Sequence, residues 1–170
     1  AVSGITYGSI QVPINLGSGG GSTVDLSPRG GAIYLSVLGN SVINGSIISS
    51  GITGGGSGGS IYLSSNNISG SGILNANGFG SSNIAGGGGG RISIILTNAT
   101  DFLGFVGNIT TYGGSGTSGG GGGNGKGAAG TIYLKTANQT YGTLIVDNNG
   151  VAPASGTSAL ISENVTNITV

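Results

Sequence analysis

The sequence predicts an all-β fold, a short parallel β-solenoid (β-helix-like) with glycine-rich loops and extended terminal strands. The first observation behind this prediction is a glycine-rich segment that leads directly into an alternating apolar segment four times, at residues 30–35, 58–63, 86–96 and 129–134. A unit that recurs in this way is an internal repeat, and stacked repeats bury apolar faces that one repeat cannot bury alone.

Two features of the composition agree with that prediction. The chain has 41 glycines but only three prolines, and its glycines do not fall at every third residue, so collagen is excluded. The Ile, Leu and Val residues form short, regularly placed groups, which disordered glycine-rich tracts lack. At 170 residues the chain is also long enough to bury a core.

The chain divides into three parts. Residues 1–28 form an extended N-terminal segment and linker, residues 29–150 carry the repeats, and residues 151–170 form a C-terminal extended segment. In the first part, four apolar side chains alternate with small or polar ones, the period of a half-buried strand: Ile10, Val12, Ile14 and Leu16. Pro13 has no N–H to donate, so we expect an edge strand or an added strand here.

Each repeat is expected to contain two strands joined by a turn-rich connection. The first strands are predicted at Ala32–Val37, Ser60–Ser64, Arg91–Leu96 and Thr131–Thr136. The second strands are predicted at Gly45–Ser49, Gly72–Ala76, Gly107–Tyr112 and Gly142–Val146. Stacking equivalent strands in parallel would bury continuous rows of Ile and Leu side chains.

The first strands should also present a ladder of outward-facing tyrosines. Tyr34, Tyr62 and Tyr133 occupy equivalent positions, and Ser93 is the gap in the ladder. Packing of the rings beneath the glycine loops is the favoured interpretation. A face on which carbohydrate stacks is the alternative.

Two runs of five glycines, Gly86–Gly90 and Gly119–Gly123, exceed what a tight corner needs. They are either mobile surface loops or extended segments that pack on one another through Cα–H···O contacts. We favour the ordered form, because the second strand of one repeat needs a fixed path to the first strand of the next.

The C-terminal part holds two strand-like segments, Ser158–Ile161 and Val165–Val170. We expect the second of them to cap the stack or to pair with another subunit. The candidate assembly strands therefore carry Ile10, Val12, Ile14, Leu16, Ile168 and Val170.

Charge and reactive side chains are scarce. Four basic residues balance four acidic ones, so no basic cluster exists for nucleic acid, and no apolar run approaches the roughly 18 residues of a membrane span. The chain has no Cys for a disulfide framework or thiolate metal site and no His for a Ser-His-Asp triad. Its few acids are dispersed, and none lies in the glycine runs. We therefore expect no enzyme activity, no cofactor and no metal.

Seven Asn-X-Ser/Thr sequons occur, more than we expect by chance from this composition: Asn44, Asn67, Asn98, Asn108, Asn138, Asn164 and Asn167. We expect export and N-glycosylation at these candidates, with chance occurrence as the alternative. The chain begins at Ala1 rather than Met, which indicates a cleaved signal peptide or a fragment of a longer protein.

Three segments carry a resemblance: Gly-Gly-Ser-Ile-Tyr-Leu at 58–63, Gly-Ser-Gly-Ile-Leu-Asn-Ala-Asn-Gly at 70–78 and the glycine run leading into Arg-Ile-Ser-Ile at 86–94. Residues 29–150 resemble the glycine-rich β-solenoid segments of large microbial surface proteins and adhesins. The two terminal parts are similar in character to the donor strands of extracellular filament subunits.

The resemblance implies an exported structural protein at the cell surface or outside the cell. Such a subunit would assemble head to tail with copies of itself, by strand addition, into a filament or surface coat. The alternative is a glycan-binding adhesin or tail-fibre tip module. An ice-binding solenoid is disfavoured, because Thr110 and Thr111 have no counterparts in the other second strands.

Overall fold

The computed structural model describes residues 8–19, 28–81, 84–117, 125–152 and 163–170. Within these ranges the chain is all-β, as predicted, with eleven strands and no helix. It follows that this part of the chain holds no helix capable of spanning a membrane. The strands are β1 (Ala32–Ser36), β2 (Asn40–Val42), β3 (Ser46–Ile48), β4 (Ser60–Ser65), β5 (Asn67–Ser69), β6 (Ile73–Asn75), β7 (Arg91–Leu96), β8 (Asn108–Thr110), β9 (Thr131–Lys135), β10 (Thr143–Ile145) and β11 (Asn167–Thr169).

All eight predicted repeat strands are present. The first strands are β1, β4, β7 and β9, and the second strands are β3, β6, β8 and β10. Two further strands, β2 and β5, were not predicted from the sequence, and they pair with each other in parallel. Each has only three residues and a mostly polar sequence, so neither carries the apolar alternation that identifies a strand.

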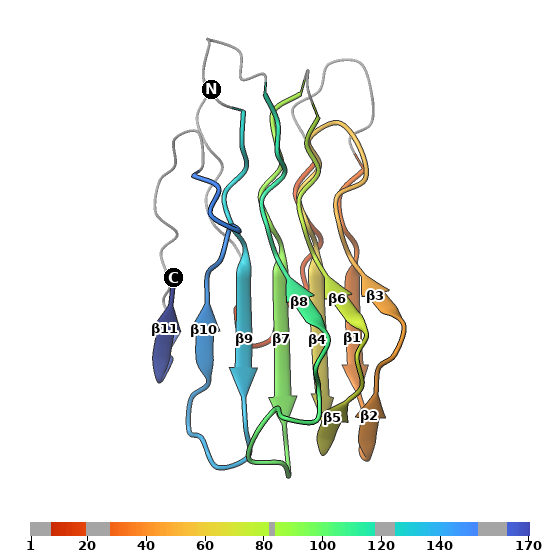
Figure 1. Cartoon of the computed structure of the whole chain (residues 1–170), viewed down its shortest axis with the longest axis vertical. Helices are drawn as coiled ribbons and strands as arrows, with labels where there is room; N and C mark the ends of the chain where they lie inside the picture. Colours follow the sequence, from red (N-terminus) through yellow and green to blue (C-terminus); the bar gives the residue numbers. More distant parts are fainter. Residues whose placement is uncertain (1–7, 20–27, 82–83, 118–124, 153–162) are drawn as a thin grey trace.

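Six strands form the main sheet, in the order β1-β4-β7-β9-β10-β11 (Figure 1). Its first four strands are parallel and in register, so that Ile33, Ile61, Ile92 and Ile132 lie side by side. A parallel three-stranded sheet, β3-β6-β8, and the β2-β5 pair lie across from them. The main sheet is mixed, and none of the three sheets closes on itself within the described residues.

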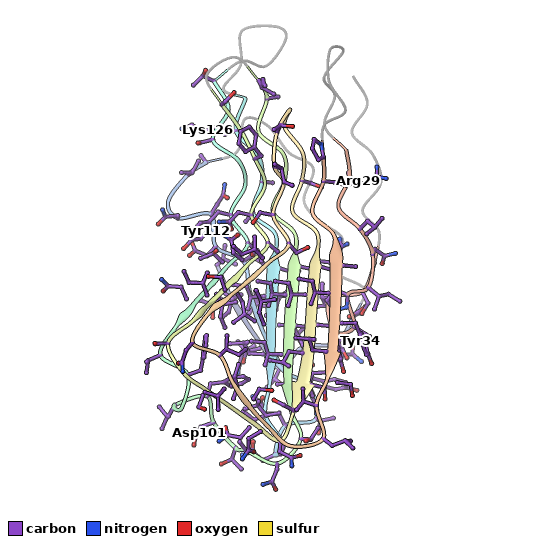
Figure 2. The ribbon with its side chains drawn as sticks, turned by 90° about the vertical axis from the view of Figure 1, so that its right-hand side faces the viewer. Arg29, Tyr34, Asp101, Tyr112 and Lys126 are labelled. Atoms are coloured by element: carbon purple, nitrogen blue, oxygen red, sulfur yellow. The ribbon has the colours of Figure 1, made fainter. Side chains whose placement is uncertain are left out.

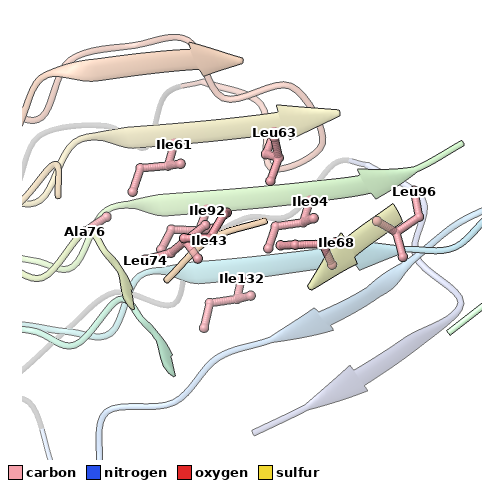
Figure 3. Close-up of a cluster of buried hydrophobic side chains, with 10 residues drawn as sticks. All are labelled: Ile43, Ile61, Leu63, Ile68, Leu74, Ala76, Ile92, Ile94, Leu96 and Ile132. Carbon is pink, nitrogen blue, oxygen red and sulfur yellow. The ribbon is translucent and has the colours of Figure 1, made fainter. Parts of the chain in front are cut away.

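The core lies between the main sheet and the two smaller sheets (Figure 3). Alternate side chains of the parallel strands point into it, because successive residues of a strand face opposite sides. Ten buried side chains form this cluster: Ile43, Ile61, Leu63, Ile68, Leu74, Ala76, Ile92, Ile94, Leu96 and Ile132. Each fully buried Ile or Leu stabilises the fold by about 1.5–3 kcal/mol relative to exposure, so the stacked rows are the main source of stability.

The prediction that the fourth second strand stacks on the other three is wrong. Instead of joining β8, β10 pairs antiparallel with β9 and parallel with β11. The Gly142 N–H donates to the Tyr133 hydroxyl at 2.7 Å, and Leu144 packs against the buried Tyr133 ring. A Cβ at Gly142 would collide with the Leu134 carbonyl, so glycine is what allows the chain to fold back beside β9.

Beyond the main strands, glycine-rich segments lie side by side in what we call the glycine layer, residues 49–59, 76–81, 84–90, 111–116 and 125–130 (Figures 1 and 2). Its hydrogen bonds repeat every three residues. The N–H groups of Gly86 and Gly89 donate to one neighbouring segment, at Gly125 and Ala128, whereas those of Gly87 and Gly90 donate to another, at Phe79 and Ala76. In a β-strand the backbone N–H groups would alternate between two neighbours with a period of two. The period of three found here is that of a polyproline II helix, which has about three residues per turn.

The run Gly86–Gly90 is therefore extended and packed, as favoured from the sequence, but its hydrogen bonds join it to more than two neighbouring segments and do not form a flat sheet. The second run, Gly119–Gly123, falls largely on residues outside those described. Packing in the layer is backbone against backbone. A Cβ added at Gly87, Gly89 or Gly90 would lie less than 3.0 Å from a carbonyl oxygen of an adjacent segment.

Gly88 is the exception within the same run, because a Cβ there would lie 3.8 Å from the Ala128 carbonyl oxygen, in ordinary contact. We predict that Gly89→Ala lowers the free energy of unfolding by about 3 kcal/mol, because the methyl group must displace a neighbouring backbone. The matched Gly88→Ala variant should leave this free energy unchanged or raise it by up to about 1 kcal/mol, since alanine restricts the unfolded chain. Urea unfolding of both variants measures the difference, and equal midpoints would contradict the packing described.

Candidate functional site: the outer face and free edges of the main sheet

The outer face of the main sheet, turned away from the core, carries the three predicted tyrosines, but only one of them is exposed. Tyr34 is 57% exposed, whereas Tyr62 and Tyr133 are buried. Figure 2 shows Tyr34 at β1, on the side away from the core. The rings of Tyr34 and Tyr62 stack with their centroids 4.7 Å apart and their planes 11° from parallel. The predicted ladder, with Ser93 as its gap, is therefore confirmed in register, but two of its three rings are covered.

Burial raises the pKa of Tyr62 above its ordinary value of 10.0, a hydrogen bond with Ser64 lowers it, and the neighbouring Tyr34 raises it slightly. The phenol of Tyr62 is thus neutral at neutral pH. Tyr34 forms the exposed side of the stacked pair.

Residues 8–19, which we call the N-terminal strap, cross the outer face. The Ser60 hydroxyl donates to the Asn15 carbonyl and the Ser93 hydroxyl to the Gln11 carbonyl, both at 2.6 Å. Ile10 is buried in a small apolar cluster with Tyr133 and Leu144. Ser93 is thus more than a gap between tyrosines, because its hydroxyl holds the strap to β7.

The predicted edge strand at the N-terminus is wrong within the described residues, since the strap contains no strand. It lies on the face of the sheet, where the Ser60 and Ser93 hydroxyls reach its carbonyls, and only its end, at Gly17 and Ser18, forms backbone hydrogen bonds, with Gly30 and Ser57. Ile10 and Pro13 are buried, whereas Val12, Ile14 and Leu16 are exposed. The alternating apolar residues therefore do not share one buried face.

The strap is also bound to the C-terminal part of the chain. The Glu163 carboxylate accepts hydrogen bonds from the backbone N–H groups of Ile10, at 3.2 Å, and Gln11, at 3.0 Å. The Gln11 side-chain amide donates to the Asn164 carbonyl at 3.0 Å. Hydrogen bonds to a charged acceptor are among the stronger ones in proteins, so Glu163 ties the two ends of the described chain together.

The main sheet ends in two edges. Among the described residues, β1 pairs only with β4 and β11 pairs only with β10. Ile168 in β11 is 58% exposed, and Val170 beyond it is also exposed. Of the six candidate assembly residues, then, Ile168 and Val170 lie at a sheet edge and the four N-terminal ones lie in the strap.

The first repeat forms one exposed end of the described molecule. Its strands β1, β2 and β3 each pair on one side only, with β4, β5 and β6. None of the three contains a charged residue or a proline. Tyr34, Val42 and Ile48 of these strands are exposed apolar side chains.

The sequons differ in accessibility. Six have an exposed asparagine: Asn44, Asn98, Asn108, Asn138, Asn164 and Asn167. Asn67 is half-buried in β5, and its side-chain oxygen accepts a hydrogen bond from the Ile68 N–H at 2.8 Å. The Asn138 side-chain oxygen also has a partner, the Thr136 hydroxyl.

The two described aspartates have local backbone partners. Asp101 accepts from the Leu103 N–H and Asp147 from the Asn149 N–H, which is the ordinary role of aspartate in turns. Within the described ranges, no group of three or more His, Cys, Asp or Glu side chains is placed to hold a metal ion.

No protein-family model, curated protein or solved structure matches the chain in the three comparisons made. The functional interpretation therefore depends on the geometry of the chain itself. The most distinctive part of that geometry is the contrast between a covered sheet face and two sheet edges that, within the described residues, pair with no further strand.

We predict that Ile10→Ala lowers the free energy of unfolding by about 2–4 kcal/mol, because it leaves a cavity beside Tyr133 and Leu144. Val12→Ala is the matched control, since Val12 lies in the same strap with an exposed side chain. Its effect should stay within about 0.5 kcal/mol. Thermal unfolding at fixed pH measures both changes, and a neutral Ile10→Ala would contradict a docked strap.

Proposed function

We propose that this chain is an exported structural protein, a subunit of an extracellular filament or surface coat. Its repeats would form a short β-solenoid, and its copies would associate head to tail by strand addition. The observation that carries the proposal is the pair of unpaired edges at opposite ends of one sheet, β1 and β11, within the described residues.

The in-register parallel stacking of equivalent residues supports the solenoid. The column of Ile33, Ile61, Ile92 and Ile132 is what successive turns of one would produce. Three of the repeats also contribute a strand to the β3-β6-β8 sheet, and the glycine layer carries the chain from one repeat to the next.

The composition of the first repeat supports assembly at its edge. An exposed strand edge is a template for another strand, and monomeric proteins usually protect it with charged residues, proline or bulges. The strands β1, β2 and β3 contain neither charges nor proline. The net charge of zero also gives little repulsion between copies.

Export is supported by the accessible sequons, because an attached glycan needs an exposed asparagine. The six exposed sites give the protein a surface suited to N-glycosylation, while Asn67 has the least room for a glycan. These features are those of a glycoprotein outside the cell or on its surface.

A second candidate function, a glycan-binding adhesin or tail-fibre tip module, is favoured by the stacked Tyr34–Tyr62 pair. Its outer ring, Tyr34, is exposed, as a platform for a sugar ring requires. A glycan array probed with the wild-type protein and Tyr34→Ala separates the two functions. Loss of glycan binding with assembly retained would support the adhesin.

The open edge can be blocked without breaking the fold. In β1, the Gly31 carbonyl accepts from the Ser60 N–H and the Val37 N–H donates to the Ser64 carbonyl, so odd-numbered residues face β4. Even-numbered residues therefore direct their N–H and C=O groups toward the free edge. Ser36 is one of these, and it is exposed.

We predict that Ser36→Pro keeps the protein folded and abolishes its assembly, because proline removes only an edge-facing donor. The neighbouring Val37→Pro is the matched control. It removes the 2.8 Å ladder bond to Ser64 and should lower the free energy of unfolding by about 1–3 kcal/mol. Sedimentation velocity and negative-stain microscopy measure assembly. A wild-type protein that stays monomeric at high concentration would overturn the proposed function.

A further inference from the structure

We infer a defined junction between copies, an inference that rests on the proposed function. In it, the free edge of β11 in one copy pairs antiparallel with the free edge of β1 in the next, with Ile168 opposite Tyr34. Three observations lead to this pairing: the directions of the two strands, the residues whose backbone groups point toward each free edge, and the face of the sheet from which the side chains project.

Strand direction makes the junction antiparallel. The strands β1, β4, β7 and β9 are parallel, β10 runs opposite to β9, and β11 runs with β10. Copies that continue the main sheet therefore bring β11 beside a β1 of opposite direction. Antiparallel pairing is slightly more stable per residue than parallel pairing.

Hydrogen-bonding phase selects the residues that face each other. In β11, the Thr169 carbonyl accepts from the Val146 N–H, so odd-numbered residues face β10 and Ile168 faces the free edge. In β1, the edge-facing residues are Ala32, Tyr34 and Ser36. Two antiparallel strands exchange both hydrogen bonds only between residues that face each other, so Ile168 must oppose one of these three.

The face of the sheet from which the side chains project agrees with this hydrogen-bonding pattern. Ile168 lies opposite Leu144, which lies opposite Tyr133, and Tyr133 is in register with Ser93, Tyr62 and Tyr34. Ile168 and Tyr34 therefore project from the same outer face. A slip of one residue would break this agreement and turn Ile168 toward the core side.

Tyr34 is the best match among the three possible partners. It is the only large apolar residue of the three, and its exposure of 57% nearly equals the 58% of Ile168. An aromatic residue opposite a β-branched one is a favourable cross-strand pair. This register also places Val170 opposite Ala32, and neither of these side chains carries a charge.

The test uses cysteine cross-linking of the full chain, made in a host without N-glycosylation so that Asn167 carries no glycan. Because the protein has no cysteine, introduced thiols are the only ones present. Facing Cα atoms in such a pair lie about 5.5 Å apart, within the roughly 4.4–6.8 Å that a disulfide spans. Tyr34→Cys and Ile168→Cys single variants are mixed with oxidised and reduced glutathione.

We expect the mixed disulfide dimer to exceed each symmetric dimer at least tenfold, and the double variant to form covalent ladders. The control replaces Tyr34→Cys with Leu35→Cys, whose side chain lies on the opposite face, and this pair should not cross-link. Unfolding midpoints verify that each variant folds. If Tyr34→Cys does not fold, Ala32→Cys with Val170→Cys tests the same register, since both residues are exposed.

Four results would overturn the junction. Predominant symmetric dimers would exclude head-to-tail pairing, and equal cross-linking by Leu35→Cys would exclude the register. Wild-type polymers without cross-linking in either cysteine pair would show that assembly uses another surface, which overturns the junction but leaves the proposed function standing. A wild-type protein that remains monomeric would overturn both.

Discussion

Close approach of backbones in the glycine layer is the constraint on which the stacked strands depend. Neighbouring strands in a sheet lie about 4.8 Å apart, so the segments that connect successive repeats must stack at a similar spacing. Side chains would hold those segments apart, as the contacts around Gly87, Gly89 and Gly90 show. The glycines thus permit the in-register rows of Ile and Leu that form the core.

The faces of the main sheet are covered by other segments, whereas its edges are not covered by any described strand. Its inner face is covered by the smaller sheets, and part of its outer face is covered by the N-terminal strap, which Ser60, Ser93 and Glu163 hold in place. Within the described residues its two edges have no further strand partner. A fold that covers its faces and leaves uncharged edges available is suited to growth along the direction in which strands add.

Local patterns predicted the all-β class and all eight repeat strands. This was possible because the alternation of apolar residues, and the glycine-rich segments that lead into it, are properties of short stretches of sequence. They failed where a long-range contact decided the outcome. The second strand at β10 has the same local pattern as the others, but Tyr133 and Leu144 draw it back beside β9. The strap has the alternation of a strand, yet hydroxyls of Ser60 and Ser93 bind it flat on a face. Tyr62 and Tyr133 lie in the predicted register and are buried, and Ile10 of the strap packs in one cluster with Tyr133.

The candidate site shows the same division. The sequence by itself determined that Ile168 and Val170 belong to an extended terminal segment and that the first repeat lacks charge and proline. Only the tertiary structure decided that β1 and β11 lie at opposite edges of one sheet, with opposite directions. The physical reason is that the spacing of apolar residues and the composition are local properties of the chain. The order and direction of the strands depend instead on which distant segments bury apolar surface together.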